Sequence, residues 1–166
     1  MAAIKNLKDL YLDGVKDLYS ACKQAVPVTE ELAAAAKNAD LKQALEASAK
    51  GTRDGMAQME KLAKSHGEDA SGEHCKGMEG LVTEARKHAL EAEFADEDTQ
   101  DAAIIAQYQR LAHYAITGYG TLKAWAKRLD LADDAKVLDE ATASTYEGDE
   151  DMTRIAVKGG VNKAAM

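Results

Sequence analysis

The longest uninterrupted amphipathic pattern in the chain runs from Ile104 to Leu129 and predicts a helix that is buried on several sides. Residues at steps of three and four define one stripe of this helix: Ile105, Gln109, Ala112, Ile116, Tyr119, Lys123 and Ala126. A neighbouring set of mostly apolar residues widens the stripe: Ile104, Tyr108, Leu111, Ala115, Leu122 and Trp125. Because so much of its circumference is apolar, this helix must be covered by other helices.

Patterns of the same period elsewhere in the chain predict three more long helices and one short helix. Their approximate ranges, including the helix described above, are 6–38, 40–65, 78–94, 99–129 and 134–157. The first helix has a possible N-cap at Asn6 and a Pro at position 27, where we expect a kink near Gln24 rather than an end. A polar, Gly-rich loop is predicted from His66 to Gly77.

The ends of the predicted helices carry turn and capping residues. The acidic run at 96–98 is suited to the N-terminus of the long fourth helix, and residues 131–133 predict a tight turn. Gly159 and Gly160 should stop the last helix and leave a frayed tail over 159–166. Gly51 and Gly55, one turn apart in the second helix, indicate either close approach of another helix or a weakened segment, and we favour close approach.

Together these elements predict one all-α domain over residues 1–166. Two pairs of long antiparallel helices are joined by short turns, and the segment between the pairs is long enough to run the length of a bundle. This is a ferritin-like four-helix bundle with a long crossover that carries an extra short helix.

Composition narrows the functional classes. Pro, Phe and Trp occur once each, which disfavours a β-sheet protein. The net charge of -8 argues against binding to nucleic acid. Two cysteines are too few for a secreted disulfide framework, and we find no signal peptide or membrane span. We therefore expect a soluble cytoplasmic protein.

The histidines do not match the metal motif of ferritin-like bundles. That motif is Glu-x-x-His, but the residues three positions before the four histidines are Ala63, Ser71, Ala85 and Arg110. His113 lies beside the apolar stripe of the long helix and has no acidic neighbour on its own helix. We therefore predict a hydrogen-bonded core or boundary histidine.

Other candidate ligands and nucleophiles also have simple structural explanations. Glu84 and His88 are one turn apart and favour at most a weak surface metal site. His66, His74 and Cys75 do not have zinc spacing. Cys22 is predicted to be a small inward hydrophobe, and Tyr108, Tyr114 and Tyr119 are predicted to be packing residues. Lys50 and Arg53 should either form boundary salt bridges with Glu147 or Asp149 or be two solvated cations whose side-chain stems lie along the helix surface.

Four stretches of the chain resemble the YciE/YciF family of bacterial stress-response proteins. They are LYSACKQ at 18–24, MEGLVTEA at 78–85, DAAIIAQ at 101–107 and HYAITGYGTL at 113–122. The resemblance covers nearly the whole chain. It implies a homodimeric ferritin-like bundle with an extra short helix and a metal site.

This chain departs from the family pattern where the resemblance places the metal. Neutral or basic residues replace the expected acids and histidines: Cys22, Ser48, Lys50, Gly51, Arg53, Ala112, Ala115, Ala143, Ser144 and Thr145. Asp149 is kept, and His113 belongs to the matching HY pair. A dinuclear iron or manganese centre needs several carboxylates to balance four or more positive charges, so one aspartate is not sufficient.

We therefore predict a non-enzymatic structural or stress-response protein without a functional dinuclear metal centre and without a cofactor. The vestigial positions of that centre are Cys22, Ser48, Gly51, Ala112, His113, Thr145 and Asp149. An alternative is a ferritin-like oxidase or iron-handling protein that binds iron or manganese at an atypical site around His113, Asp149 and Cys22. A third possibility is a small-molecule binder that uses the vacated core. We expect a homodimer that binds neither nucleic acid nor membrane.

Overall fold

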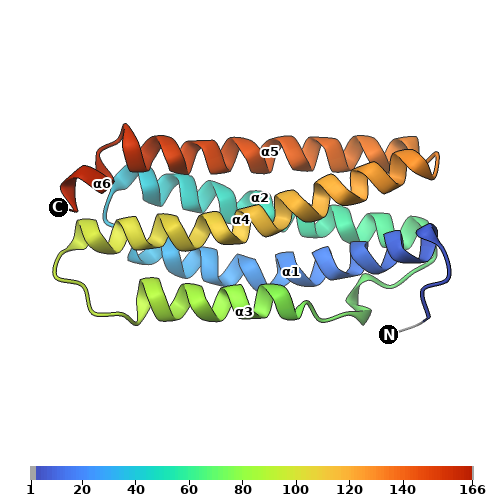
Figure 1. Ribbon diagram of the computed structural model, residues 1–166, viewed down its shortest axis with the longest axis horizontal. Helices are drawn as coiled ribbons and strands as arrows, with labels where there is room; N and C mark the ends of the chain where they lie inside the picture. The colour runs from blue at the N-terminus through green and yellow to red at the C-terminus, as the bar shows by residue number, and fades with distance from the viewer. Residues whose placement is uncertain (1–2, 166) are drawn as a thin grey trace.

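The computed structural model describes residues 3–165 and contains four long helices that lie side by side (Figure 1). They are α1 (Leu7–Ala35), α2 (Ala39–Ser65), α4 (Glu97–Arg128) and α5 (Ala132–Val157). The segment between α2 and α4 contains a 3-10 turn, η1 (Ala70–Gly72), the short helix α3 (Lys76–Ala85) and a π-helical turn, η2 (Arg86–Leu90). The described residues include no β-strand.

Asparagine and aspartate side chains define where three of the long helices begin. The side chain of Asn6 accepts a hydrogen bond from the backbone N–H of Asp9, and Asn38 caps α2 in the same way. Asp96 caps α4 by accepting from Thr99. Each cap satisfies an N–H group that has no partner inside the helix. The predicted cap at Asn6 and the acidic cap of the fourth helix are confirmed.

The order of the helices in space follows from two short turns and one long connection. α1 and α2 are antiparallel and pack along their lengths, as do α4 and α5 (Figure 1). The connection between the pairs returns along the bundle, and its helix α3 packs against α1 and α4. A single long crossover is the connectivity of ferritin-like bundles. The predicted all-α bundle with a helix in its crossover is confirmed.

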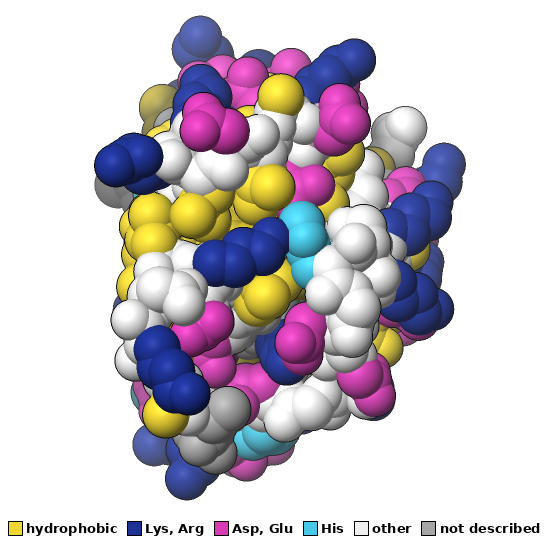
Figure 2. Space-filling model, turned by 90° about the vertical axis from the view of Figure 1, so that its right-hand side faces the viewer, with side chains coloured by type: hydrophobic (Ala, Val, Ile, Leu, Met, Phe, Trp, Pro, Cys, Tyr) yellow, Lys and Arg dark blue, Asp and Glu magenta, His cyan; other side chains and the backbone are white. Residues whose placement is uncertain are grey.

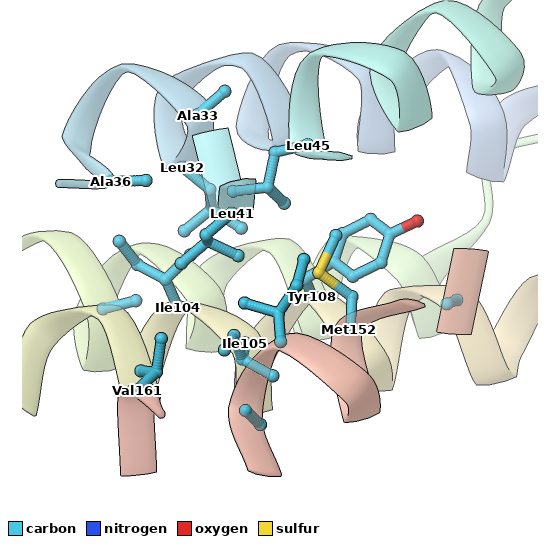
Figure 3. Close-up of a cluster of buried hydrophobic side chains, with 14 residues drawn as sticks. Leu32, Ala33, Ala36, Leu41, Leu45, Ile104, Ile105, Tyr108, Met152 and Val161 are labelled. Carbon is cyan, nitrogen blue, oxygen red and sulfur yellow. The ribbon is translucent and has the colours of Figure 1, made fainter. Parts of the chain in front are cut away.

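Large apolar side chains fill one end of the bundle. In this packed end (Figure 3), residues from α1, α2, α4, α5 and α6 are almost completely buried: Leu32, Leu41, Leu45, Ile104, Ile105, Met152, Ile155 and Val161. A second cluster, built around Tyr11, Val15, Leu122 and Leu138, fills the opposite end. Figure 2 shows that end of the molecule, where charged side chains surround exposed hydrophobic ones. Both termini of each long helix are thus anchored by burial of apolar area.

Two predicted boundaries were wrong by a few residues. The short helix ends at Leu90 rather than near Phe94, because its last turn widens into a π-helical turn. The helix α5 begins at Ala132, so the sharp turn lies earlier than predicted. Asp130 makes that turn with a φ of 58°, a left-handed conformation that Asp tolerates better than most residues.

The C-terminal tail is structured rather than frayed as predicted. The preceding helix ends at Val157, and Gly160 then adopts a left-handed conformation with a φ of 88°, which glycine does without steric cost. The chain then forms a short helix, α6 (Val161–Ala164), and the side chain of Val161 is buried in the packed end. Residue 166 of the predicted tail lies outside the described residues.

The prediction of close approach at two glycines is confirmed at one of them. A Cβ atom on Gly55 would lie 2.5 Å from the hydroxyl oxygen of Tyr119, whereas a Cβ atom on Gly51 would meet nothing within 4 Å. The α1 helix continues through Pro27, as predicted. Within residues 3–165, none of the helices combines the length and the apolar character needed to cross a membrane.

Candidate functional site

A cavity of about 550 Å³ lies between the middle parts of α1, α2, α4 and α5. We call it the central cavity. Many of the residues that line it are small: Ala21, Ala25, Ala44, Ala47, Gly51, Gly55, Ala112, Ala115, Ala141 and Gly148. At the two ends of the bundle, larger side chains fill the corresponding space. Larger apolar side chains, including Leu18, Met78 and Leu111, complete the wall.

Five of the seven positions that the family resemblance predicts to be vestigial metal positions line this cavity. They come from all four long helices: Cys22, Ser48, Gly51, Ala112 and Thr145. None of these five carries a carboxylate or an imidazole. The hydroxyl of Thr145 donates to the carbonyl oxygen of Ala141 in its own helix, as Ser and Thr side chains in helices commonly do.

The other two positions, His113 and Asp149, form a pair that does not line the cavity. The Nε2 atom of His113 lies 3.0 Å from Oδ2 of Asp149. The other oxygen of Asp149 accepts a hydrogen bond from Gln109. His113 is therefore hydrogen-bonded, as predicted, but its side chain is 61% exposed and does not belong to the core. Its acidic partner comes from α5, a contact that the spacing within one helix could not indicate.

The thiol of Cys22 is buried at the cavity wall and lies 3.3 Å from the hydroxyl of Tyr119. Burial raises the pKa of Cys22 to about 11, so the thiol stays protonated at neutral pH. A protonated buried thiol is a poor nucleophile and a poor metal ligand. The prediction that Cys22 behaves as a small inward hydrophobe agrees with this geometry. Cys22 is not brought together with His113 and Asp149 into one cluster of ligands.

Tyr108 contributes a hydroxyl to the cavity wall. Its ring packs against the packed end, and the hydroxyl points away from that cluster (Figure 3). The hydroxyl oxygens of Tyr108 and Ser48 both lie near Gly148: a Cβ atom added there would be 3.6 Å and 3.9 Å from them, in ordinary van der Waals contact. Burial raises the pKa of Tyr108 above its ordinary value, so the hydroxyl is a neutral hydrogen-bonding group.

Carboxylates gather where the cavity opens between α2 and α5. Asp54, Glu140, Glu147 and Asp151 line it, and all four residues are exposed. On α5 they share one helix face with Ser144, because 140, 144, 147 and 151 follow steps of three and four. The predictions from the sequence did not include this group of acids, although the spacing of its members on α5 indicates the shared face. Among residues 3–165, no group of three or more His, Cys, Asp and Glu side chains is arranged to hold one metal ion.

The predicted partner of Arg53 was wrong. Arg53 forms an ion pair with Glu30 of α1 instead of Glu147 or Asp149 of α5. Arg53 and Lys50 do not line the cavity. The reason is the position of Arg53 on the α1 side of α2, which puts the antiparallel neighbour within reach.

His74 and His88 lie in separate ion pairs at the surface. His74 pairs with Glu79 and His88 with Glu84, in agreement with the predicted one-turn contact of the latter pair. Cys75 lies 2.9 Å from the hydroxyl of Tyr114. His66, His74 and Cys75 therefore each bond to a different group, and they do not form a shared site.

Sequence reasoning missed a polar cluster at the end of the bundle shown in Figure 2. The hydroxyl of Tyr11 donates to Oδ2 of Asp134, and Nε2 of His66 lies 2.6 Å from the same oxygen. Nζ of Lys8 lies 2.8 Å from Nδ1 of His66. Tyr11 and Asp134 are 123 positions apart in the chain, so no local pattern could have joined them. The cluster ties α1, the end of α2 and the start of α5 together.

Comparison with known proteins identifies the family. A family model described as a domain of unknown function, DUF892, matches residues 6–166. The chain belongs to this family. Its curated relative, protein YciF of Escherichia coli strain K12, is 32% identical over 163 residues, which is 98% of this chain and 96% of YciF. The resemblance seen in the sequence is therefore confirmed.

Two solved structures of YciF-type proteins match the fold. The crystal structure of the E. coli stress protein YciF superposes with a TM-score of 0.86 at 30% identity and covers 93% of this chain and 96% of that one. YcfI of Rhodopseudomonas palustris, described as a candidate structural protein, has a TM-score of 0.86 at 32% identity and covers 93% and 97% of the two chains. The chain is thus a YciF-type helical bundle over nearly its whole length.

Proposed function

We propose that this YciF-type protein has a non-enzymatic structural role in a bacterial stress response and lacks a functional dinuclear metal centre. The observation that carries the proposal is the chemistry of the central cavity. At the positions where the family resemblance places metal ligands, its wall carries Cys22, Ser48, Gly51, Ala112 and Thr145. The description of YciF as a stress protein, and of YcfI as a candidate structural protein, supports the assigned role.

The charge balance of the wall supports the absence of such a centre. Two divalent ions bring four positive charges, which carboxylates in the first coordination sphere must neutralise. The acids that line the cavity are exposed where it opens between α2 and α5, which we call its mouth. They do not form a group that could hold an ion. None of the buried polar side-chain atoms in residues 3–165 lacks a hydrogen-bonding partner, so none requires an ion to satisfy it.

Metal analysis tests this proposal. The protein is expressed in media supplemented with iron or with manganese, purified without chelators and measured by plasma mass spectrometry. We expect far less than one ion per chain. Restoring one acid with Thr145→Glu should leave this result unchanged, because a single carboxylate cannot balance a dinuclear site. Near-stoichiometric metal in either protein contradicts the proposal.

The alternative of an iron or manganese protein with an atypical site has its own test. His113 and Asp149 are the one histidine–carboxylate pair among the vestigial positions. If metal copurifies with the wild-type chain and is lost in His113→Ala, this alternative replaces the structural proposal. The expected homodimer is a separate proposal, which light scattering coupled to size-exclusion chromatography would test.

A further inference from the structure

We propose that the central cavity binds linear aliphatic diamines and triamines. The methylene chain lies against the apolar wall, and the ammonium groups lie at the carboxylates of the mouth. This ligand site goes beyond the structural role proposed above. Its test uses amines rather than metals, so the two proposals can fail independently.

The inner wall of the cavity is suited to a narrow alkyl chain. Leu18, Met78 and Leu111 present apolar surface, and the alanines and glycines around them leave room beside it. Removing methylene groups from water favours their burial against such a wall. Pockets of this size, mostly apolar with a few polar groups, are the usual form of small-molecule sites.

A buried hydroxyl offers a hydrogen bond inside the cavity. Tyr108 is only 7% exposed, and its hydroxyl is directed away from the apolar cluster into the cavity wall beside Ser48. This hydroxyl forms a hydrogen bond with the side chain of Ser48, and the lone pairs that the bond leaves on the two oxygens can accept from a ligand. An ammonium group is a donor only, so it pairs with the lone pairs of the tyrosine and serine oxygens.

The spacing of the mouth carboxylates favours an extended cation over a single ion. Glu140 and Asp151 are eleven positions apart on one helix, which corresponds to about 16 Å at the helical rise per residue. Glu147 lies between them, and Asp54 faces them from α2. One compact ion cannot contact acids that are so far apart, whereas two or three ammonium groups along a chain can. Arg53 is held by Glu30 and does not line the opening, so it does not neutralise this charge.

Calorimetry with defined probes tests the proposal. Spermidine, a triamine, and cadaverine, a diamine, are titrated into the full chain, with 1,5-pentanediol as the uncharged analogue of cadaverine. We expect saturable binding of both amines with one site per chain, tighter for spermidine, and no binding of the diol. Absence of saturable amine binding up to millimolar concentration overturns the proposal.

A blocking variant locates the site. A side chain at Gly51 would meet nothing within 4 Å, so Gly51→Leu should fold while placing a large side chain at the cavity. The matched control is Gly80→Leu, at an exposed helical glycine of α3 that also has open space and does not line the cavity. We expect at least about a tenfold loss of amine affinity in Gly51→Leu and none in Gly80→Leu, given the loss of both packing and access. Equal affinities in the two variants contradict the assigned site.

Two charge-neutralising double variants separate specific amine binding from general attraction of cations to an acidic protein. Asp54→Asn combined with Glu147→Gln removes two charges from the mouth. Glu46→Gln combined with Glu150→Gln removes two exposed charges from the same helices away from the cavity. We expect about a fivefold loss of spermidine affinity in the first pair, as for two solvent-screened ion pairs, and little change in the second. Equal losses in both pairs would mean nonspecific counter-ion binding and would overturn the proposal.

Discussion

The packed end and the central cavity are built from the same four helices but differ in side-chain size. At the packed end, Leu32, Leu41, Leu45 and Ile104 are fully buried and fill the space between the helices (Figure 3). A few turns away, alanine, glycine, serine and threonine occupy the equivalent inner faces and leave a cavity. The same helices run through both regions, and the difference in side-chain volume accounts for the packed end and the cavity. The free energy of unfolding should therefore depend mainly on residues of the packed end, and the binding of a ligand on residues of the central cavity.

The largest expected effect is a truncation in the packed end. Leu45→Ala should lower the free energy of unfolding by about 3 kcal/mol, because a close-packed site leaves a cavity when a large side chain is removed. Thr145→Ala, in the wall of the existing cavity, should change it by less than about 0.5 kcal/mol. Urea denaturation measures both values. Similar losses in the two variants would show that the middle is packed as tightly as the end.

A buried carboxylate at the packed end should be the next most sensitive position. Asp101 is 1% exposed, and its two oxygens accept hydrogen bonds from the backbone N–H groups of Lys37 and Asn38 in the turn between α1 and α2. Asp101→Ala should cost about 2 kcal/mol, because two donors lose their partner. Asp101→Asn keeps one acceptor and should cost less. A larger loss for Asn than for Ala in urea denaturation would disprove this explanation.

Two glycines at the cavity should respond in opposite directions. Gly55→Ala should destabilise the chain by about 1–2 kcal/mol, because the added methyl group would collide with the hydroxyl of Tyr119. Gly51→Ala should stabilise it by about 0.5–1 kcal/mol through helix propensity alone.

The collision at Gly55 has an internal control. In a Tyr119→Phe background the clashing hydroxyl is absent, so Gly55→Ala should lose most of its cost. Thermal denaturation of the four proteins in this double-mutant cycle gives the coupling between the two sites. If the cost of Gly55→Ala is the same in both backgrounds, the hydroxyl is not its cause.

The smallest expected effect concerns pH and the crossover. A hydrogen bond from Arg86 in η2 keeps the pKa of Glu31 in α1 below its ordinary value of 4.5. Since the pKa is lower in the folded chain, this pair stabilises the fold above pH 4.5 and is lost as the pH falls through the folded-state pKa. Both side chains are more than a third exposed, so solvent screening limits the effect to a few tenths of a kcal/mol.

Stability measured against pH checks this assignment. Glu31→Gln should flatten the decrease in stability below pH 4.5 slightly and leave the slope above that pH unchanged. Glu46→Gln, at an exposed position on α2, is the control and should not flatten it. An equal response of the two variants would mean that the Arg86 contact carries no measurable stability.

Much of the fold could be predicted from local signals in the sequence. Asn6 and the acids before α4 identified helix starts, because capping depends on residues three positions apart. The apolar stripe from Ile104 onward identified the helix that contacts α1, α3, α5 and α6. The errors lie where a distant contact overrides the local pattern. Glycines before Val161 predicted a frayed tail, but burial of that valine among residues of the packed end holds α6 in place.

The candidate site was predictable only in part. The family resemblance singled out five inner positions as hypothetical former metal positions, and only the placement of the helices in space showed that these five line one cavity. The partner of His113 on α5, the pairing of Arg53 with α1 and the shared hydrogen bonds of Asp134 all join residues from different helices. Helical periodicity defines the face of a residue but not the register between two helices, so it could not identify these partners.

The sequence by itself determined the helices, their apolar faces and the family. These features depend on residue type and on spacing within about one turn, where backbone geometry is the same in every helix. Only the tertiary structure decided that the small residues enclose a cavity, that four carboxylates stand at its mouth and that the tail packs. Each of these depends on the relative position of helices far apart in the chain, because side-chain volume and charge act through space rather than along the sequence.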